Sequence, residues 1–214
     1  MLEKLPEAIG HALFERRAGL DKLGFYRVGL RAGMGTIEVR SSAFVDQAPL
    51  PARFTADGAG VSPPLQWSGL PPDTVSVVLL VEDADSPTPW PLVHAIVTGM
   101  PPEQNGLAEA AIDRHADDAP RHVGRNSFLG ARWLPPDPPP GHGVHRYAFQ
   151  VFALGADVPR SETPGRDEVL DAVRRSALAS GLLIGTFERP DGSVREPATA
   201  ADPAPVAPDL DGSR

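Results

Sequence analysis

The sequence contains no cysteine among its 214 residues. Disulfide bonds, thiolate nucleophiles and cysteine-ligated zinc are therefore excluded as sources of stability or chemistry. No apolar run approaches the ~20 residues that a membrane-spanning helix needs. Residues 1–19 carry charges throughout and lack the apolar core of a secretory signal. These absences predict a cytoplasmic protein without integral membrane association.

Positive charge is also scarce, because 20 lysines and arginines stand against 28 aspartates and glutamates, giving a net charge of −8. Nucleic acid is therefore not an expected partner, and an anionic ligand would need a local positive site. The G-x-S-x-G, Walker and H-E-x-x-H signatures are absent. GHGVHR, residues 141–146, begins like a dinucleotide motif, but it precedes a predicted strand where that motif must open a helix. No cofactor is predicted.

Proline and glycine are abundant instead, with 25 and 21 residues, and they predict many turns and few long helices. Apolar runs of strand length predict buried strands. These runs lie at residues 75–83, 93–100 and 146–154, with an alternating strand at 36–44 and a last strand at 182–189. Residues 166–181 predict a helix with an apolar stripe of Val169, Leu170, Val173 and Leu178. Gly181 is expected to end that helix.

The chain divides into three parts. Residues 1–35 form an N-terminal helical extension, because Leu2, Leu5, Ile9, Leu13 and Leu20 fall near helical spacing. Its mixed charges favour a helix packed on the body or on another subunit over one at a membrane surface. Residues 36–190 form a β domain. Residues 191–214 are rich in proline and alanine and are expected to be disordered.

Polar side chains collect at the ends of the predicted strands. Asp83 and Asp85 end one strand, His94 begins another, and His145 and Tyr147 share a face at the start of a third. An aspartate beside an imidazole would orient the ring and favour its charged form. These five side chains predict a pocket that meets a ligand at the strand ends.

Each of these residues also has a plain structural interpretation. An aspartate before Ser-Pro commonly caps a loop, and a lone histidine on a strand is more often a satisfied core group. Gly141 and Gly143 offer backbone N–H groups that could surround an anion, or could form an ordinary turn.

Several segments together resemble the phosphatidylethanolamine-binding protein family, also known as Raf kinase inhibitor-like proteins, and its bacterial branch in particular. The matching segments are DGAGVSPPLQWSGLPP, LLVEDADSPTP, PLVHAIV, GRNSFLG, PPGHGVHRYAFQVFAL and LIGTFER. They span roughly residues 37–189 in the family's order. The extensions at 1–35 and 197–214 fall outside this resemblance.

The resemblance implies a mainly β fold, in which a large antiparallel Greek-key sheet packs against a smaller sheet, with few peripheral helices. It also implies a small pocket for anions such as phosphate head groups, with a cis peptide bond in the TPWP loop. The lining residues would be Asp83, Asp85, Pro87, His94, Gly141, Gly143, His145 and Tyr147. The chain departs from the family pattern at Ala95, Ala131 and Leu134, where Trp90 and Trp133 would refill the space.

The leading hypothesis is a non-enzymatic binding protein for phosphate, a phosphoethanolamine-like head group or a phosphorylated residue. The histidines and Tyr147 would donate hydrogen bonds, and the aspartates would hold the imidazoles and accept from an amine. The alternative is a metal-dependent or His/Asp hydrolase that uses the same pocket. A third interpretation is a regulator of a protein kinase or another partner. A homodimer is a further expectation.

Overall fold

The computed structural model describes residues 6–28, 34–112, 121–156, 159 and 161–189. The predicted tail at 191–214 and the apolar residues Leu2 and Leu5 lie outside this part of the chain. None of the helices within it is long and apolar enough to cross a membrane.

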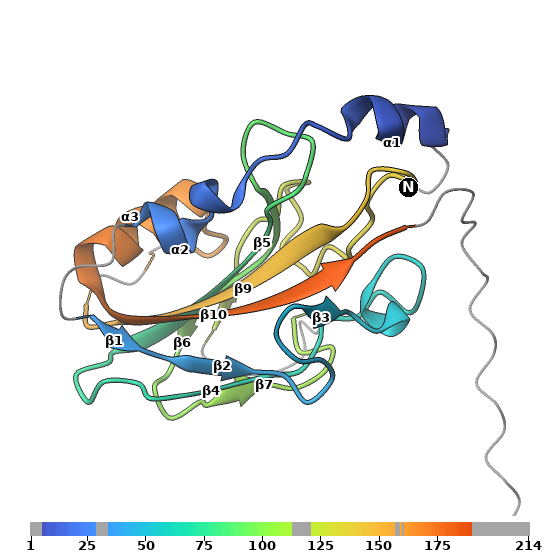
Figure 1. Cartoon of the computed structure of the whole chain (residues 1–214). Helices are drawn as coiled ribbons and strands as arrows, with labels where there is room; N and C mark the ends of the chain where they lie inside the picture. The colour runs from blue at the N-terminus through green and yellow to red at the C-terminus, as the bar shows by residue number, and fades with distance from the viewer. Residues whose placement is uncertain (1–5, 29–33, 113–120, 157–158, 160, 190–214) are drawn as a thin grey trace, which may run out of the picture.

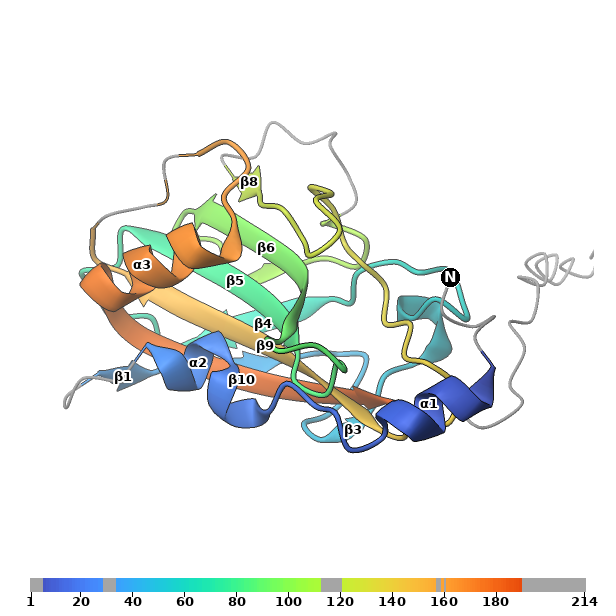
Figure 2. The same cartoon turned by 90° about the horizontal axis from the view of Figure 1, so that it is seen from above.

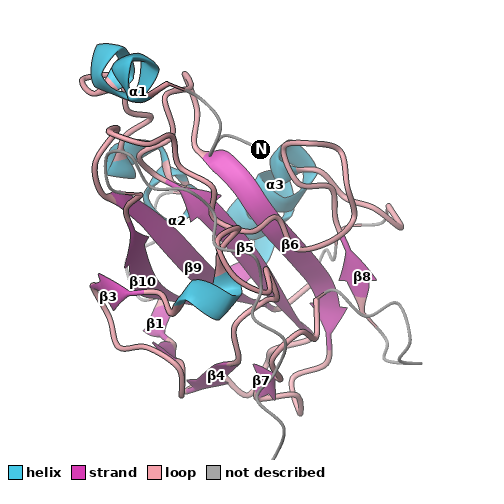
Figure 3. Ribbon diagram, turned by 90° about the vertical axis from the view of Figure 1, so that its right-hand side faces the viewer, coloured by secondary structure: helices cyan, strands magenta, loops and turns pink. Residues whose placement is uncertain are grey.

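A large sheet and a small sheet form the body of the molecule (Figure 1). The order in the large sheet is β1 (Gly35–Thr36), β10 (Ala177–Phe187), β9 (His145–Leu154), β5 (Ser76–Asp83), β6 (Leu92–Met100) and β8 (His122–Val123), with β3 (Ala48–Pro49) also pairing with β10. The small sheet contains β2 (Glu38–Arg40), β4 (Leu65–Ser68) and β7 (Gly106–Leu107). The four long strands β5, β6, β9 and β10 pair antiparallel and run side by side (Figure 3), whereas β1 and β3 add short parallel pairs to β10.

Two helices, α2 (Gly24–Arg27) and α3 (Arg166–Ser176), cover the face of the large sheet opposite to the small sheet (Figures 1 and 2). The described residues also form α1 (Glu7–Leu13) and single 3₁₀ turns at Leu20–Lys22 and Ala52–Phe54. Helix α1 lies beyond the end of the sheet (Figure 2).

The strands are buried on both faces because each face has its own core. Val77, Leu79 and Val81 of β5 point into the core shared with the small sheet. Val78 and Leu80 point into the core shared with α3. Successive side chains of β5 therefore point alternately into the two apolar cores, which explains why the apolar run in the sequence is unbroken. The expected mainly β fold is confirmed.

A buried carboxylate holds α2 on the sheet. Glu82 of β5 is fully buried and accepts hydrogen bonds from the Gly24 amide at 2.7 Å, Gln150 Nε2 at 2.9 Å and Arg166 Nε at 2.6 Å. A buried charge needs such partners, so these three donors account for its place in an apolar layer.

The predicted helix over 166–181 is wrong in its last turn, because α3 ends at Ser176 and Ala177 begins β10. The pairing of β10 with β9 outweighs the helical propensity of this alanine-rich stretch. Gly181 is therefore a strand residue and not a helix stop. A methyl group there would lie 2.3 Å from the carbonyl oxygen of Ile37, so this strand position needs glycine.

Three further expectations need correction. The single amphipathic helix predicted within 1–35 is replaced in the described part by α1, a 3₁₀ turn and α2; α1 already ends at Leu13, and Gly19, with φ +105°, precedes the 3₁₀ turn. The strand predicted at 36–44 is split into β1 and β2, which belong to different sheets. Among the described residues no peptide bond is cis, and the TPWP loop is instead held by a hydrogen bond from Thr88 Oγ1 to the Trp90 carbonyl at 2.6 Å.

Replacing Gly181 with alanine tests the close contact between β10 and the segment before β2. We expect Gly181→Ala to lower the free energy of unfolding by about 1–3 kcal/mol, because the Ile37 backbone must move. Urea denaturation measures the change. Gly130→Ala is the control, since a methyl group there meets nothing closer than 3.4 Å. Equal stability of the two variants would contradict this account.

Candidate functional site

Strand pairing brings three of the predicted site residues together. Asp83 ends β5, and it lies directly across from Tyr147 of β9. His145 begins β9 two residues earlier and lies on the same face of the strand. All three side chains are at least 95% buried, with exposures of 5%, 0% and 1% in the order named.

A β-bulge turns His94 into the same site. Glu82 pairs with Val93 and Val81 pairs with Ala95, so His94 is an extra residue in β6. A bulge re-aims the side chain at that position. The His94 ring thereby lies 5.0 Å from the Tyr147 ring, centroid to centroid. Because of the bulge, His94 and its neighbour Ala95 both face the side of the sheet on which Asp83 and Val81 lie.

The Leu134 backbone fixes the His94 ring. Its N–H donates to the His94 carbonyl at 2.9 Å, and its carbonyl accepts from His94 Nδ1 at 2.6 Å. The family departure at Leu134 thus falls in a segment that contacts the site through main-chain atoms. Because Nδ1 must carry the hydrogen for this bond, Nε2 of neutral His94 presents a lone pair.

A chain of hydrogen bonds runs from Asp83 to the N-terminal segment. Asp83 Oδ2 lies 2.8 Å from His145 Nδ1, and His145 Nε2 lies 2.6 Å from His142 Nδ1. His142 Nε2 donates in turn to the Leu13 carbonyl at 2.8 Å. His142 was not among the predicted site residues, because the GHG loop suggested a role only for its two glycines. Its position three residues before His145, inside a proline-rich loop, was the available signal.

Counting hydrogens on this chain fixes its charge. The Leu13 carbonyl only accepts, so His142 Nε2 carries a hydrogen, and each of the other two bonds needs one more. The three hydrogen bonds need three hydrogens, whereas two neutral imidazoles supply two and a carboxylate supplies none. The chain therefore holds one excess proton that balances Asp83. Burial lowers the pKa of His142 below 6.5, and its neighbour His145 lowers it further.

Asp85 forms a second charged cluster beside the first. Its carboxylate accepts Arg146 Nε and Nη2, both at 2.7 Å, and lies 3.1 Å from Arg17 Nη1. Burial alone would raise the pKa of Asp85, but the hydrogen bonds and charges of the two arginines outweigh it and hold the pKa below the usual 3.8. Pro87 follows in the same loop and is half-buried.

Three buried polar atoms in the aromatic part of the site have no hydrogen-bond partner among the described residues. They are His94 Nε2, Tyr147 Oη and Trp133 Nε1. The Trp133 ring lies 6.1 Å from the His94 ring, so the three side chains form one cluster. Buried polar groups normally have partners, so these three atoms stand out as unsatisfied hydrogen-bonding groups in one cluster.

Burial also sets the protonation of this cluster. It lowers the pKa of His94 below the usual 6.5, and the charge of Asp83 only partly offsets it. It raises the pKa of Tyr147 well above 10.0. At neutral pH the site therefore holds a neutral imidazole acceptor and a phenol donor. Trp133 fills space beside His94, as expected, whereas Trp90 is 51% exposed and lies outside the cluster.

A buried arginine positions the glycine-containing loop over the site. Arg189 is 1% exposed and donates to the Asp57 and Asp137 carboxylates and to the Pro138 carbonyl. Its own carbonyl accepts the Gly141 N–H at 3.4 Å. Gly141 and Gly143 adopt φ +73° and +81°, which explains glycine at both positions.

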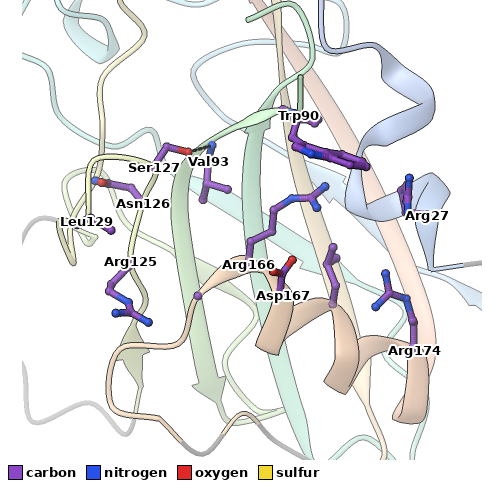
Figure 4. Close-up of a pocket in the computed structure, with 13 residues that line it drawn as sticks. Arg27, Trp90, Val93, Arg125, Asn126, Ser127, Leu129, Arg166, Asp167 and Arg174 are labelled. Carbon is purple, nitrogen blue, oxygen red and sulfur yellow. Dashed lines mark hydrogen bonds between the residues drawn. The ribbon is translucent and has the colours of Figure 1, made fainter. Parts of the chain in front are cut away.

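A separate groove of about 730 Å³ lies between α2, β6 and α3 (Figure 4). Its rim is basic, with Arg27, Arg125, Arg166 and Arg174. Three of these arginines already have partners, since Arg166 binds Glu82, Arg174 binds Asp171 and Arg27 lies over the Trp90 ring. None of the predicted site residues lines this groove.

Comparison with known proteins identifies the family. The model of the phosphatidylethanolamine-binding protein family matches residues 40–188. A UPF0098 protein of Methanothermobacter thermautotrophicus is 33% identical over 156 residues, which cover 72% of this chain and 99% of the relative. The crystal structure of CT736 from Chlamydia trachomatis, a homolog in the same family, is 30% identical with a TM-score of 0.65, over 72% of this chain and 98% of CT736. YbcL of Escherichia coli is 26% identical with a TM-score of 0.66, over 71% of this chain and 98% of YbcL.

The protein is thus a two-sheet β protein with a buried polar site at the strand ends. It belongs to the phosphatidylethanolamine-binding protein family, which confirms the resemblance found in the sequence. Another relative, LppC of Mycobacterium tuberculosis, is named as a candidate lipoprotein and is 32% identical over 152 residues. Family membership therefore does not assign a compartment, and the cytoplasmic location stays a prediction.

The Asp85 cluster generates a pH-dependent prediction. We expect Asp85→Asn to lower the free energy of unfolding by about 2 kcal/mol at pH 7, because two arginines lose a buried partner. Because the folded pKa of Asp85 is depressed, its contribution is present above the unfolded value of 3.8 and is lost as pH falls through the folded pKa. The difference in free energy of unfolding between wild type and Asp85→Asn should therefore become smaller at acidic pH. Denaturation at several pH values, with exposed Asp73→Asn as control, measures it; a gap independent of pH would count against the pairing.

Proposed function

We propose that this protein is a non-enzymatic binding protein that captures a small phosphate-bearing head group beside His94, Trp133 and Tyr147. The observation that carries this proposal is the set of three buried polar atoms without partners on those side chains. Leaving one buried donor or acceptor unsatisfied costs about 1–3 kcal/mol, so a ligand that satisfies all three recovers that cost.

The chemistry of the three atoms suits a phosphate monoester. Tyr147 Oη and Trp133 Nε1 are donors without partners among the described residues and can donate to phosphate oxygens. His94 Nε2 accepts from a P–OH group, or takes up a proton and then donates. Asp83 does not repel the anion, because the excess proton of the Asp83–His145–His142 chain balances its charge.

The second charged cluster supplies the site for an ammonium group. Asp85 accepts two arginines, and Arg17 comes from the N-terminal segment outside the family match. When Arg17 leaves, the carboxylate can accept a ligand ammonium in its place. Phosphoethanolamine carries both charges, so the two clusters together match its two ends.

The alternative hydrolase has less support. Among the described residues no group of three or more histidines and carboxylates has the arrangement of a metal site. The Asp83–His145–His142 chain ends on a backbone carbonyl instead of a nucleophilic side chain. A regulatory role toward a protein kinase and a homodimer stay predictions.

Calorimetry with phosphoethanolamine tests the proposal on the full chain. We expect Tyr147→Phe and His94→Gln each to weaken binding about tenfold, because each removes one polar contact to a charged ligand. Tyr26→Phe and His122→Gln change the same residue types at exposed positions and should leave the affinity unchanged. Unaltered affinity in both site variants would refute this location.

Binding should also depend on pH. Because His94 has a lowered pKa in the free protein and gains a proton or a P–OH contact with the ligand, protonation and binding favour each other. We expect affinity to rise as pH falls from about 8 to about 6, in the region where histidines titrate. Calorimetry in two buffers of different ionisation enthalpy measures the proton uptake. Constant affinity with no uptake would exclude a role for His94 protonation.

A further inference from the structure

Residues 13–19, LFERRAG, lie across the loops that carry the site; we call this segment the cap. It follows α1 and precedes α2, so it is held on the body at both ends (Figures 1 and 2). It lies before residue 40, where the family match begins. CT736 and YbcL align over 98% of their own lengths, yet they cover only 72% and 71% of this chain.

The cap contacts the aspartate loop through its backbone. The Ala18 N–H donates to the Ser86 carbonyl at 3.0 Å, and the Gly19 N–H donates to the Ala84 carbonyl at 2.7 Å. Gly19 adopts φ +105°, which turns the chain after these two bonds. Ala18 is 3% exposed, so the cap is packed against this loop.

Arg17 contacts the histidine loop and the aspartate loop at once. Nη2 donates to the His142 carbonyl and Nη1 to the Val144 carbonyl, both at 2.8 Å, while Nη1 also lies 3.1 Å from Asp85 Oδ1. A guanidinium group has the fork geometry to satisfy several acceptors together. Arg17 therefore bridges the two loops between which the site lies.

The rest of the segment is fitted to the histidine loop as well. The Leu13 carbonyl accepts from His142 Nε2, the last bond of the chain that begins at Asp83. A methyl group on Gly10 would lie 1.9 Å from the Pro140 carbonyl oxygen, so α1 touches this loop backbone to backbone. A methyl group on Gly143 would lie 3.0 Å from the Phe14 ring. Small residues on both sides thus permit the close contact.

The result is a site without an open entrance on this side. Asp85, His142 and His145 are each at most 1% exposed, although they lie in loops at the ends of strands. The cap covers these residues by placing the Arg17 guanidinium beside the Asp85 carboxylate and the Leu13 carbonyl beside the His142 imidazole.

We infer that the cap is an internal ligand that closes the site in the resting protein and has to be displaced before a head group enters. This inference rests on the proposed function, because it concerns access to the same site. It makes Arg17 a competitor of the ligand for Asp85. Apparent affinity then equals the affinity of the open site reduced by the fraction of molecules that are open.

The test compares Arg17→Ala with Arg16→Ala in the full chain. Arg16 is the exposed neighbour, and its replacement removes the same charge without removing a bridge between the loops. Hydrogen exchange of the Ala18 and Gly19 amides reports cap opening without any ligand. Calorimetry with phosphoethanolamine reports access to the site.

We expect Arg17→Ala to raise the exchange rate of these two amides about tenfold or more, and to tighten phosphoethanolamine binding by a similar factor. Arg16→Ala should match wild type in both measurements. Arg17→Lys keeps the positive charge but loses the forked guanidinium group. Its amide exchange rate and its phosphoethanolamine affinity should therefore lie between those of wild type and Arg17→Ala. Slow hydrogen exchange of the β5 and β9 amides shows that a variant is folded. If Arg17→Ala exchanges rapidly in these strands, the comparison of Arg17→Lys with wild type tests the inference instead.

The outcomes separate the two proposals. If wild type and the Arg17 variants bind phosphoethanolamine equally, the cap is only a structural brace and this inference is overturned, while the proposed function stands. If Arg17→Ala opens the cap and neither protein binds, the proposed function is overturned, and the regulatory role is overturned with it.

Discussion

The hydrogen bond between the buried carboxylate of Asp83 and His145 Nδ1 is the interaction on which the site depends. A carboxylate that is 5% exposed at the end of a central strand needs a charged partner, and His145 is the residue that the register of β9 brings to it. The other nitrogen of His145 forms a hydrogen bond with His142 Nδ1, and His142 Nε2 donates to the Leu13 carbonyl. One buried charge thus organises a strand end, a loop and the N-terminal segment in sequence.

The N-terminal segment is held by two consecutive carboxylates of the same strand. Glu82 points to the helix side of the large sheet and accepts from the Gly24 amide, which docks α2. Asp83 points to the opposite face and reaches Leu13 through the two histidines. Because successive residues of a strand point to opposite faces, one dipeptide anchors the segment on both sides of the sheet edge. A segment outside the family match is in this way tied to the candidate site within it.

Much of the fold could be predicted from the sequence because buried strands are continuous apolar runs, and β5, β6 and β9 are found within one residue of their expected bounds. The end of α3 could not, since the Ala177–Gly181 stretch is helical by propensity and becomes a strand only through pairing with β9. The residue types at the strand ends predicted Asp83, Asp85, His94, His145 and Tyr147 as one pocket, and the structure places Asp85 in a cluster of its own beside the other four. The bulge at His94 has no local signal in the sequence, and the roles of His142 and Arg17 arise from contacts between segments more than 100 residues apart.

The central claim is that the cluster of His94, Trp133 and Tyr147 receives a phosphate group once residues 13–19 move aside. A crystal structure of the full chain with phosphoethanolamine tests it most directly. The account predicts phosphate density within hydrogen-bond distance of Tyr147 Oη and Trp133 Nε1, with Arg17 no longer on Asp85. Density in the groove beside Arg125 and Arg166 instead, with residues 13–19 unmoved, would contradict it.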